Sequence, residues 1–360
     1  MIGNGYEVYT ISADGPEVKE VLKEGVQHIS VPFTRQITPV HDLVCLFRLV
    51  RIIKKLRPDI IHTHTPKAGL LGMVAGWICN VPVRMHTVAG LPLMVTNGFR
   101  RRLLTFTERI TCSCAQRIYP NSSGLQKFLV DDLGIPASKV KMIGRGSSNG
   151  IDTAFFSRTP DLERQALAIR TQHSINEGDV VFSFVGRIVL DKGIIELVDA
   201  FKAVAEKLES QKRIILLLVG TFEQDLDPLP PSIVKFLRED PRVILSGFQS
   251  DVRPWLMASD VFVFPSHREG FPNVVMQACL LGVPCIVSDI NGCNEIISDR
   301  VTGRIVPVQR VEVLAEAMLE LVSDLPGCKR MAIAAQSFVA SNFGREYVWK
   351  ELLKEYKVSL

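Results

Sequence analysis

The chain has 360 residues, of which 47% are hydrophobic and 22% are charged, and its formal net charge is +4. This length predicts two domains, and this composition excludes a mainly disordered chain. No apolar run approaches the roughly 18 residues that a membrane span needs, and the amino terminus lacks the basic start and apolar stretch of a signal peptide.

The first half alternates short β-rich runs with helical patterns. Strands are predicted at Val8–Ile11, His28–Val31, Ile60–His64, Val83–His86, Arg117–Pro120 and Val140–Ile143. Helices are predicted near 16–24, 40–57, 67–79, 99–115 and 122–133. Residues 1–5 read as the tail of a first helix, so the strand, turn and helix that open a doubly wound domain are expected to be missing.

The second half repeats the alternation. Strands are predicted at Val180–Gly186, Arg213–Gly220, Val243–Ser246, Val261–Pro265, Pro284–Ser288 and Arg304–Val306. Helices are predicted near 193–208, 231–238, 251–258, 273–281, 311–323, 329–341 and 344–357. The run Ile214–Val219 is apolar without alternation, which is typical of a parallel strand covered on both faces.

Two series of β-α units predict an α/β protein with two Rossmann-like, doubly wound domains. We expect domains at 1–155 and 156–342, joined within the polar stretch 152–178, and a final helix at 343–360 that returns to the first domain. Ligands of such sheets bind at the carboxyl ends of the strands. A molecule that both domains bind would therefore lie in the crevice between them.

Charge is distributed unevenly between the halves. Residues 1–160 carry 20 Lys and Arg against 11 Asp and Glu, a charge of +9, whereas the remainder carries −5. The cations cluster at 48–57 and 100–102, and apolar residues recur at helical spacing beside the first cluster: Leu43, Leu46, Phe47, Val50 and Ile53. This pattern fits either a solvated helix that packs on a sheet or a peripheral contact with anionic membrane lipid. Nucleic acid is not expected as a partner, because no nucleic-acid motif is visible.

The turn after the strand at 180–186 has the chemistry of a diphosphate site. Arg187 and Lys192 stand between the carboxyl end of that strand and a helix that begins near Gly193. Backbone N–H groups and two cations at a helix start suit paired phosphates.

A second loop follows the apolar strand Val261–Phe264. Here Gly270 permits a close backbone approach, and Asn273 can begin the next helix as a cap. Glu269 lies in the loop, and Gln277 lies one helical turn after Asn273, so both can face one ligand.

The first half offers weaker signals. His62 and His64 share one strand face, but no clear third metal ligand accompanies them. The Asp225-Leu-Asp227 sequence lies in a Pro-rich polar loop, which does not favour a metal–nucleotide site. The eight cysteines fit no zinc spacing and are expected to be reduced core thiols of a cytoplasmic protein. We expect no metal and no cofactor.

The second half resembles the donor domain of retaining glycosyltransferases of family 4, which have the two-domain GT-B fold. The matching stretches are Val185-Gly-Arg187 with Lys192-Gly193, the run from Glu269 to Val275, Gly282–Ile290, and Asn294–Gly303. The first half, through Pro58–Gly69 and Gly146–Asp152, is similar to the branch of CapM- and PglA-like enzymes. That branch builds capsular or other surface glycans on polyprenyl-diphosphate carriers.

The resemblance implies roles for particular residues. Arg187 and Lys192 would hold the diphosphate of a nucleotide-sugar donor, expected to be UDP-linked, and Glu269 would contact the transferred sugar. The amides of Gly270, Phe271 and Asn273 would contact sugar and phosphates, Gln277 the ribose, and Gly247-Phe248 the base. His64, Lys67, His86 and Arg145 would lie on the side of a lipid-linked saccharide acceptor.

Two positions depart from the family pattern. The family has Glu at both ends of its Glu-x7-Glu motif, whereas the second is Gln277 here, and Ala89 stands where a histidine is common. We expect Gln277 to weaken nucleotide binding, because an amide loses charge-assisted hydrogen bonds. Two alternatives stay open: a weak or inactive family member, and a sugar-nucleotide 2-epimerase-type isomerase.

Overall fold

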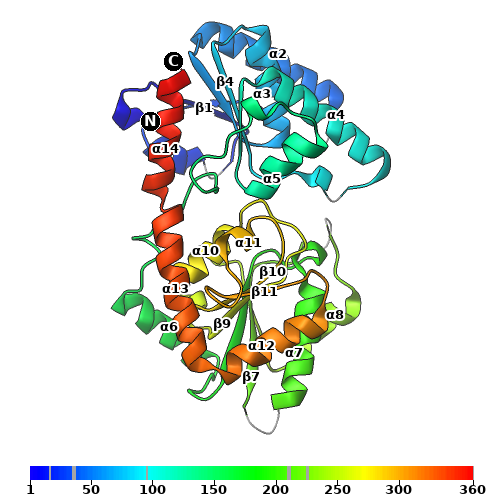
Figure 1. Ribbon diagram of the computed structural model, residues 1–360, viewed down its shortest axis with the longest axis vertical. Coiled ribbons are helices and arrows are strands. Elements are labelled where there is room, and N and C mark those ends of the chain that lie inside the picture. The colour runs from blue at the N-terminus through cyan, green and yellow to red at the C-terminus, as the bar shows by residue number, and fades with distance from the viewer. Residues whose placement is uncertain (16–17, 35–37, 95, 209–211, 224–226, 360) are drawn as a thin grey trace. The chain divides into compact units, whose positions relative to one another are not determined.

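The computed structural model describes residues 1–15, 18–34, 38–94, 96–208, 212–223 and 227–359, which form two compact units (Figure 1). The first unit holds Met1–Ser148 and Val348–Leu360, and the second holds Asn149–Tyr347. No helix in the described ranges is long and apolar enough to cross a membrane. All eight cysteines are free; six are buried, as predicted for core thiols, whereas Cys79 and Cys114 are half-buried.

The second unit is built on one six-stranded parallel sheet. Its strands run in the order β11-β10-β9-β6-β7-β8. Their bounds are β6 (Val180–Val185), β7 (Ile214–Val219), β8 (Val243–Gly247), β9 (Val261–Phe264), β10 (Cys285–Ser288) and β11 (Arg304–Val306). Every residue of β6, β7, β9 and β10 is buried, because helices cover both faces of a doubly wound sheet. The chain order reverses between β6 and β9, which is where such sheets bind ligands.

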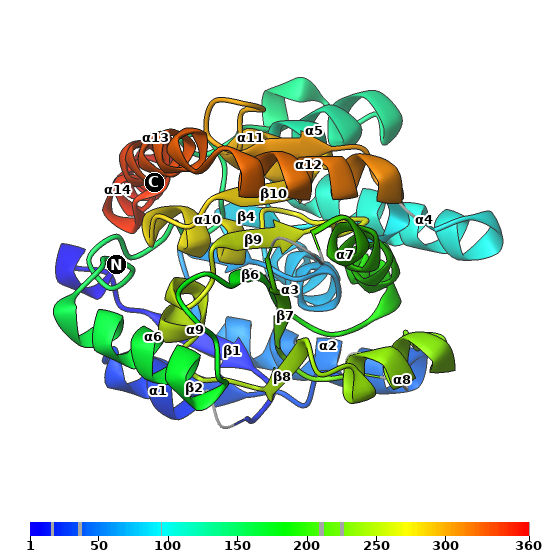
Figure 2. The ribbon, with the colours of Figure 1, turned by 90° about the horizontal axis from the view of Figure 1, so that it is seen from below.

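Helices cover this sheet along its length. They are α6 (Pro160–Gln172), α7 (Ile194–Leu208), α8 (Pro231–Glu239), α9 (Arg253–Met257), α10 (Asn273–Leu280), α11 (Cys293–Ile296), α12 (Val311–Ser323) and α13 (Leu325–Phe343). Figure 2 shows α8 beside the β8 edge and α12 towards the β11 edge. Helix α6 was not predicted, and it occupies much of the polar stretch 152–178 in which the sequence predicts the join. It forms because the Thr159 hydroxyl accepts the N–H of Leu162 at 3.3 Å, while Leu162 and Ala166 are buried.

The strands of the first unit form two separate parallel ladders. One pairs β1 (Tyr9–Ser12) with β2 (Gln27–Ser30), and the other has the order β3 (Ile60–Thr63), β4 (Val83–Val88), β5 (Arg117–Pro120). Among the described strands, no ladder joins β1 to β3. A doubly wound order has its first strand between these two. In the described residues the strands of this unit are therefore divided between β1 and β3.

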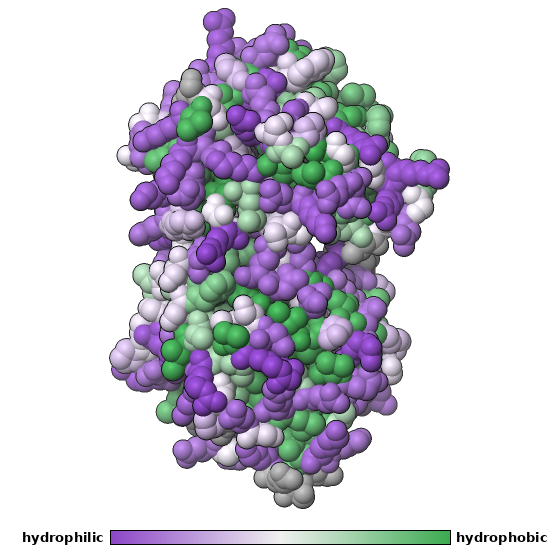
Figure 3. Space-filling view, viewed as in Figure 1, coloured by the Kyte–Doolittle hydropathy of each residue, from purple (hydrophilic) through white to green (hydrophobic). Residues whose placement is uncertain are grey.

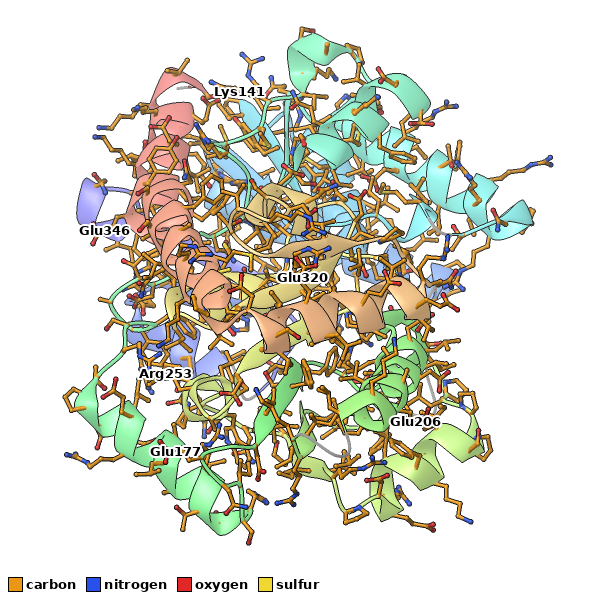
Figure 4. The ribbon with its side chains drawn as sticks, turned by 60° about the horizontal axis from the view of Figure 1, so that its bottom comes forward. Lys141, Glu177, Glu206, Arg253, Glu320 and Glu346 are labelled. Carbon is orange, nitrogen blue, oxygen red and sulfur yellow. The ribbon has the colours of Figure 1, made fainter. Side chains whose placement is uncertain are left out.

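The remaining elements of the first unit are helical. They are α1 (Val18–Lys23), α2 (Pro39–Leu56), α3 (Pro66–Ile78), α4 (Gly98–Cys114), α5 (Ser123–Lys127) and, from the end of the chain, most of α14 (Arg345–Ser359). The last turns of α14 are tied to this unit by Lys141, whose Nζ lies 2.5 Å from Oε1 of Glu355 (Figure 4). The hydroxyl of Tyr119 also donates to Oε2 of Glu355 at 3.2 Å.

The predicted strand Val140–Ile143 is wrong. Only Val140 bridges to a neighbouring strand, at Ile118. The chain then turns at Gly144 and Gly146, which have φ of 59° and 108°, so it leaves the sheet before a ladder can form.

Candidate active site

The turn after β6 presents the two predicted phosphate-binding cations. Nη1 of Arg187 lies 3.0 Å from Oε2 of Glu223, and the Arg187 side chain is 45% exposed. Lys192 ends a short 3₁₀ turn, Leu190–Lys192, and Gly193 follows with φ of 70°. A Cβ at Gly193 would lie 2.0 Å from the carbonyl oxygen of Pro265, so only glycine fits between this turn and the loop after β9.

The loop after β9 is bound to the same turn. Nζ of Lys192 lies 2.5 Å from Oε1 of Glu269, and the Ser266 hydroxyl contacts that oxygen at 3.1 Å. The backbone N–H of His267 donates to the carbonyl of Asp191 at 2.9 Å. Lys192 and Glu269 therefore form a partly shielded ion pair at the carboxyl edge of the sheet, held by both loops.

Helix α10 begins directly after this loop. Asn273 is its first residue, and Pro272 precedes it without a side-chain cap, so the prediction that Asn273 caps the helix is wrong. The loop after β10 is also bonded to this loop, because the Asn291 side-chain amide donates to the carbonyl of Gly270 at 3.1 Å. Gln277 is half-buried on α10, one turn after Asn273.

The end of β8 completes this edge. Gly247 has φ of 69°, and its carbonyl accepts the N–H of Gly220 from the end of β7 at 2.9 Å. Phe248 follows with 77% of its surface exposed. An exposed aromatic ring beside a sheet edge offers a flat face for stacking.

In the first unit, His62 and His64 lie with their rings stacked at 4.4 Å. Nδ1 of His62 lies 2.6 Å from the hydroxyl of Tyr356, and Nε2 lies 2.7 Å from Oγ1 of Thr87. Burial lowers the pKa of His62 well below its usual range, so this imidazole is neutral. His64 is exposed at the start of the loop before α3.

Lys67, in the first turn of α3, is held by side chains near α2. Its Nζ lies 2.6 Å from Oδ1 of Asp42 and donates to Oγ1 of Thr34 and Thr38 at 2.7 and 3.2 Å. Arg145 is exposed in the turn between Gly144 and Gly146.

His86 is buried, with 2% of its surface exposed. Its Nδ1 lies 2.8 Å from Oγ1 of Thr63, and its Nε2 lies 3.9 Å from Oε1 of Glu108 on α4. Burial lowers the pKa of His86 to about 4 and raises the pKa of Glu108 to about 7.

Metal-ligand clusters are not seen in the described part of the chain: no group of three His, Cys, Asp or Glu is placed to hold an ion there. Asp225 of the Asp-x-Asp sequence lies outside the described residues. Asp227 accepts the backbone N–H of Asp191 at 2.7 Å.

Comparison with known proteins covers both units. Residues 1–155 match the family described as Glycosyltransferase Family 4, and residues 166–338 match the one described as Glycosyl transferases group 1. The capsular polysaccharide biosynthesis glycosyltransferase CapM of Staphylococcus aureus is 33% identical over 98% of this chain and 90% of its own length. The chain belongs to glycosyltransferase family 4.

A second relative of this glycosyltransferase is the UDP-Gal:α-D-GlcNAc-diphosphoundecaprenol α-1,3-galactosyltransferase of Escherichia coli, 26% identical over 89% of this chain and 81% of its own. The crystal structure of HepE from Anabaena in complex with UDP matches with a TM-score of 0.79 at 20% identity, over 97% of this chain and 92% of that one. A glycosyltransferase from Rickettsia africae matches with a TM-score of 0.80 at 20% identity, over 99% and 91%. The fold is GT-B, as the resemblance implies.

The structure places several residues of the glycosyltransferase at these sites that sequence reasoning missed. Glu223 pairs with Arg187, and Arg268 donates to Asp191 at 2.9 Å. Glu108 is the least expected, since it is a carboxyl group with 5% exposure. In the sequence, its burial could be inferred only from its place on the same helical face as Thr111 and Cys112, which are also buried.

Proposed function

We propose that this glycosyltransferase transfers a hexose or N-acetylhexosamine from a nucleotide-diphosphate sugar, UDP-linked, to a polyprenyl-diphosphate-linked saccharide in capsular or surface polysaccharide synthesis. The second unit binds the donor, and the first binds the acceptor. The names of the two relatives above, a capsular enzyme and a galactosyltransferase acting on a diphosphoundecaprenol-linked sugar, support this assignment.

The observation that carries the donor assignment is the ion pair of Lys192 with Glu269 beside the start of α10. Diphosphate oxygens can take the place of the carboxylate on Lys192, while Arg187 from the same turn offers a planar fork. Glu269 then accepts from hydroxyls of the sugar. Phe248 offers a face to the base, and Gln277 lies one turn along α10 for the ribose.

The reaction breaks the bond between the anomeric carbon and the leaving phosphate oxygen, and forms a bond from that carbon to the acceptor oxygen on the same face. The acceptor hydroxyl gives its proton to the departing phosphate. The proposed mechanism retains configuration because the acceptor attacks the face that the phosphate leaves. It needs no metal because Arg187 and Lys192 stabilise the charge that develops on the diphosphate. Preorganised groups of this kind commonly contribute about 100- to 1000-fold in rate.

An acceptor on a lipid fits the surface of the first unit. On α4, Arg101, Arg102 and Arg109 line an open depression of about 520 Å³ together with Phe106. Phe99 and Phe106 are 81% and 63% exposed. Figure 3 shows hydrophilic and hydrophobic side chains interspersed on the visible face of this unit. We infer a peripheral contact with anionic membrane lipid, on the cytoplasmic side where nucleotide sugars are made.

Helix α2 carries a similar surface. The predicted apolar stripe is divided: Cys45, Leu49 and Ile53 form the buried face, whereas Leu43 and Phe47 are 57% and 69% exposed. The helix therefore packs on the unit with one face and leaves apolar side chains outside with the other, next to the cations at 48–55.

The test is transfer from UDP-sugars by Arg187→Ala and Lys192→Ala, with the exposed Lys207→Ala as the matched control. We expect each site variant to lose at least about tenfold in kcat/KM, with the control unchanged. Normal turnover in both site variants would reject the diphosphate assignment. Epimerisation of the donor sugar without acceptor would favour the isomerase alternative, and neither transfer nor hydrolysis of the donor would favour a weak or inactive family member.

A further inference from the structure

A cavity of about 180 Å³ opens at the carboxyl end of β4 in the first unit. Its walls come from three segments: His64–Pro66 before and at the start of α3, His86–Leu91 at the end of β4 and after it, and Glu108 from α4. Since a water molecule takes about 30 Å³, the cavity has room for a group the size of several waters.

Two buried polar groups face this cavity. Glu108 and His86 are 5% and 2% exposed, and the 3.9 Å between Oε1 and Nε2 is too long for a direct hydrogen bond. Within the described residues, the hydrogen-bond contact of the Glu108 carboxyl is the weak donor Sγ of Cys112 at 4.0 Å. A buried carboxyl with unused bonding capacity costs free energy unless a ligand or water satisfies it.

The imidazole is held in place from its other side. Oγ1 of Thr63 contacts its Nδ1 at 2.8 Å, and Gly69 of α3 lies against the ring, where a Cβ would be 2.5 Å from Cε1. The ring cannot turn away from the cavity without moving α3. The His86 ring is therefore held in place before any ligand arrives, which lowers the ordering cost of binding.

Among the described residues that line the cavity there is no Lys or Arg. With a neutral His86 and a carboxyl group as its buried polar groups, the cavity disfavours phosphate and favours hydroxyl or amide groups.

We propose that Glu108 and His86 form a subsite for a neutral sugar unit of the acceptor, binding its hydroxyl or acetamido group. This inference rests on the proposed function for the identity of the acceptor. It assigns Glu108 a binding role and restricts the ligand of this cavity to an uncharged sugar, leaving the diphosphate of the same acceptor to the arginines of α4.

The titratable groups that face Glu108 are His86 from β4, His64 from the segment before α3, and Cys112 one turn along α4. Burial raises the pKa of Glu108 to about 7, and the carboxylate accepts stronger hydrogen bonds from hydroxyls than the acid does. The KM for the acceptor should therefore fall as pH rises through 7, and this dependence should vanish in Glu108→Gln.

Saturation-transfer NMR with methyl α-N-acetylglucosaminide tests the subsite without catalysis, with glucose 1-phosphate as the anionic probe. The variants are Glu108→Gln, of nearly equal size, and Glu24→Gln, which makes the same change at an exposed carboxyl of the first unit. We expect saturation transfer to the neutral glycoside in the wild type and in Glu24→Gln, and at least a fivefold loss in Glu108→Gln with its melting temperature no lower than wild type.

Equal signals in Glu108→Gln and wild type, no signal in the wild type, or stronger transfer to glucose 1-phosphate would each overturn the subsite. The companion assay uses UDP-galactose and N-acetylglucosamine-diphosphoundecaprenol, the donor and acceptor named for the E. coli relative. If galactose is transferred and the KM for the acceptor is unchanged in Glu108→Gln, the subsite is rejected and the proposed function stands. NMR binding lost in Glu108→Gln, with no transfer from any UDP-sugar, upholds the subsite and rejects the function.

Discussion

At the scale of single residues, the two proposed phosphate-binding cations differ in burial. The side chains of Lys192 and Glu269 are 13% and 17% exposed, whereas Arg187 is 45% exposed. Removing one partner of a shielded ion pair leaves a charge without compensation and commonly costs about 3–5 kcal/mol when the pair is buried. Lys192→Ala should therefore lose stability as well as activity, and Arg187→Ala is the cleaner probe of phosphate binding.

Gln277 offers a gain-of-binding test. A carboxylate on α10 accepts stronger bonds from vicinal hydroxyls than an amide, since charge-assisted hydrogen bonds are roughly twice as strong. Gln277→Glu should lower the Kd for UDP by about five- to tenfold in calorimetry, and Gln172→Glu, an exposed change in the same unit, should leave it unchanged. No gain in Gln277→Glu would remove this residue from the ribose site.

Glu108 predicts a pH dependence of stability. Its pKa is raised from 4.5 to about 7 in the folded chain, so the folded state holds a proton that the unfolded state releases as pH rises from 4.5 to 7. The fold therefore loses stability over that window, by up to about 3 kcal/mol. Glu108→Gln removes this loss: its free energy of unfolding should match wild type near pH 4.5 and exceed it at pH 8. If the free energies of unfolding of Glu108→Gln and wild type differ by the same amount at pH 4.5 and pH 8, the raised pKa of Glu108 is contradicted.

The scale of the secondary-structure element shows how helix α3 fixes the first unit. Gly69 lies against His86, and a Cβ at Gly72 would lie 2.7 Å from Cγ2 of Thr63. Small residues on one face let the helix approach β3 and β4 closely. The helix thus holds both the imidazole and the hydroxyl that contacts it.

The stability of Gly69→Ala tests how closely helix α3 packs against β4. The added methyl meets a buried ring that is bonded to Thr63, so overpacking should cost about 1–3 kcal/mol in spite of the better helix propensity of alanine. Gly76→Ala on the same helix is the control, because its nearest contact would be 3.3 Å to a side-chain methyl of Ile61. Chemical denaturation compares them, and equal stability of the two variants would show that the ring gives way.

Most elements could be predicted from local pattern, and the exceptions have local causes. The strand Val140–Ile143 was predicted from β-branched residues, but pairing stops after Val140 because the chain turns at the following glycines. Helix α6 was overlooked because polar residues dominate it, and its two buried side chains are enough to dock it.

At the scale of the whole molecule, the uneven charge predicts an electrostatic response. Residues 1–160 carry +9, and α4 combines arginines with exposed phenylalanines. We expect the protein to sediment with vesicles containing phosphatidylglycerol at low salt, and to be released as salt screens the charges. Arg101→Glu with Arg102→Glu should abolish most of this binding.

The matched control reverses two exposed cations elsewhere, Lys329 and Arg330 on α13 of the second unit. It changes the net charge equally and should leave vesicle binding intact. A wild-type protein that stays in the supernatant with anionic vesicles would show that the basic face of α4 is merely solvated.

The sequence by itself determined two Rossmann-like units and the places of the cationic turns, because periodicity and turn chemistry act over a few residues. Only the tertiary structure decided which side chains meet. Lys192 meets Glu269 across 77 positions, and His62 meets Tyr356 across 294. The orientation of Glu108 towards His86 depends on how α4 packs against α3, and no local pattern encodes that packing.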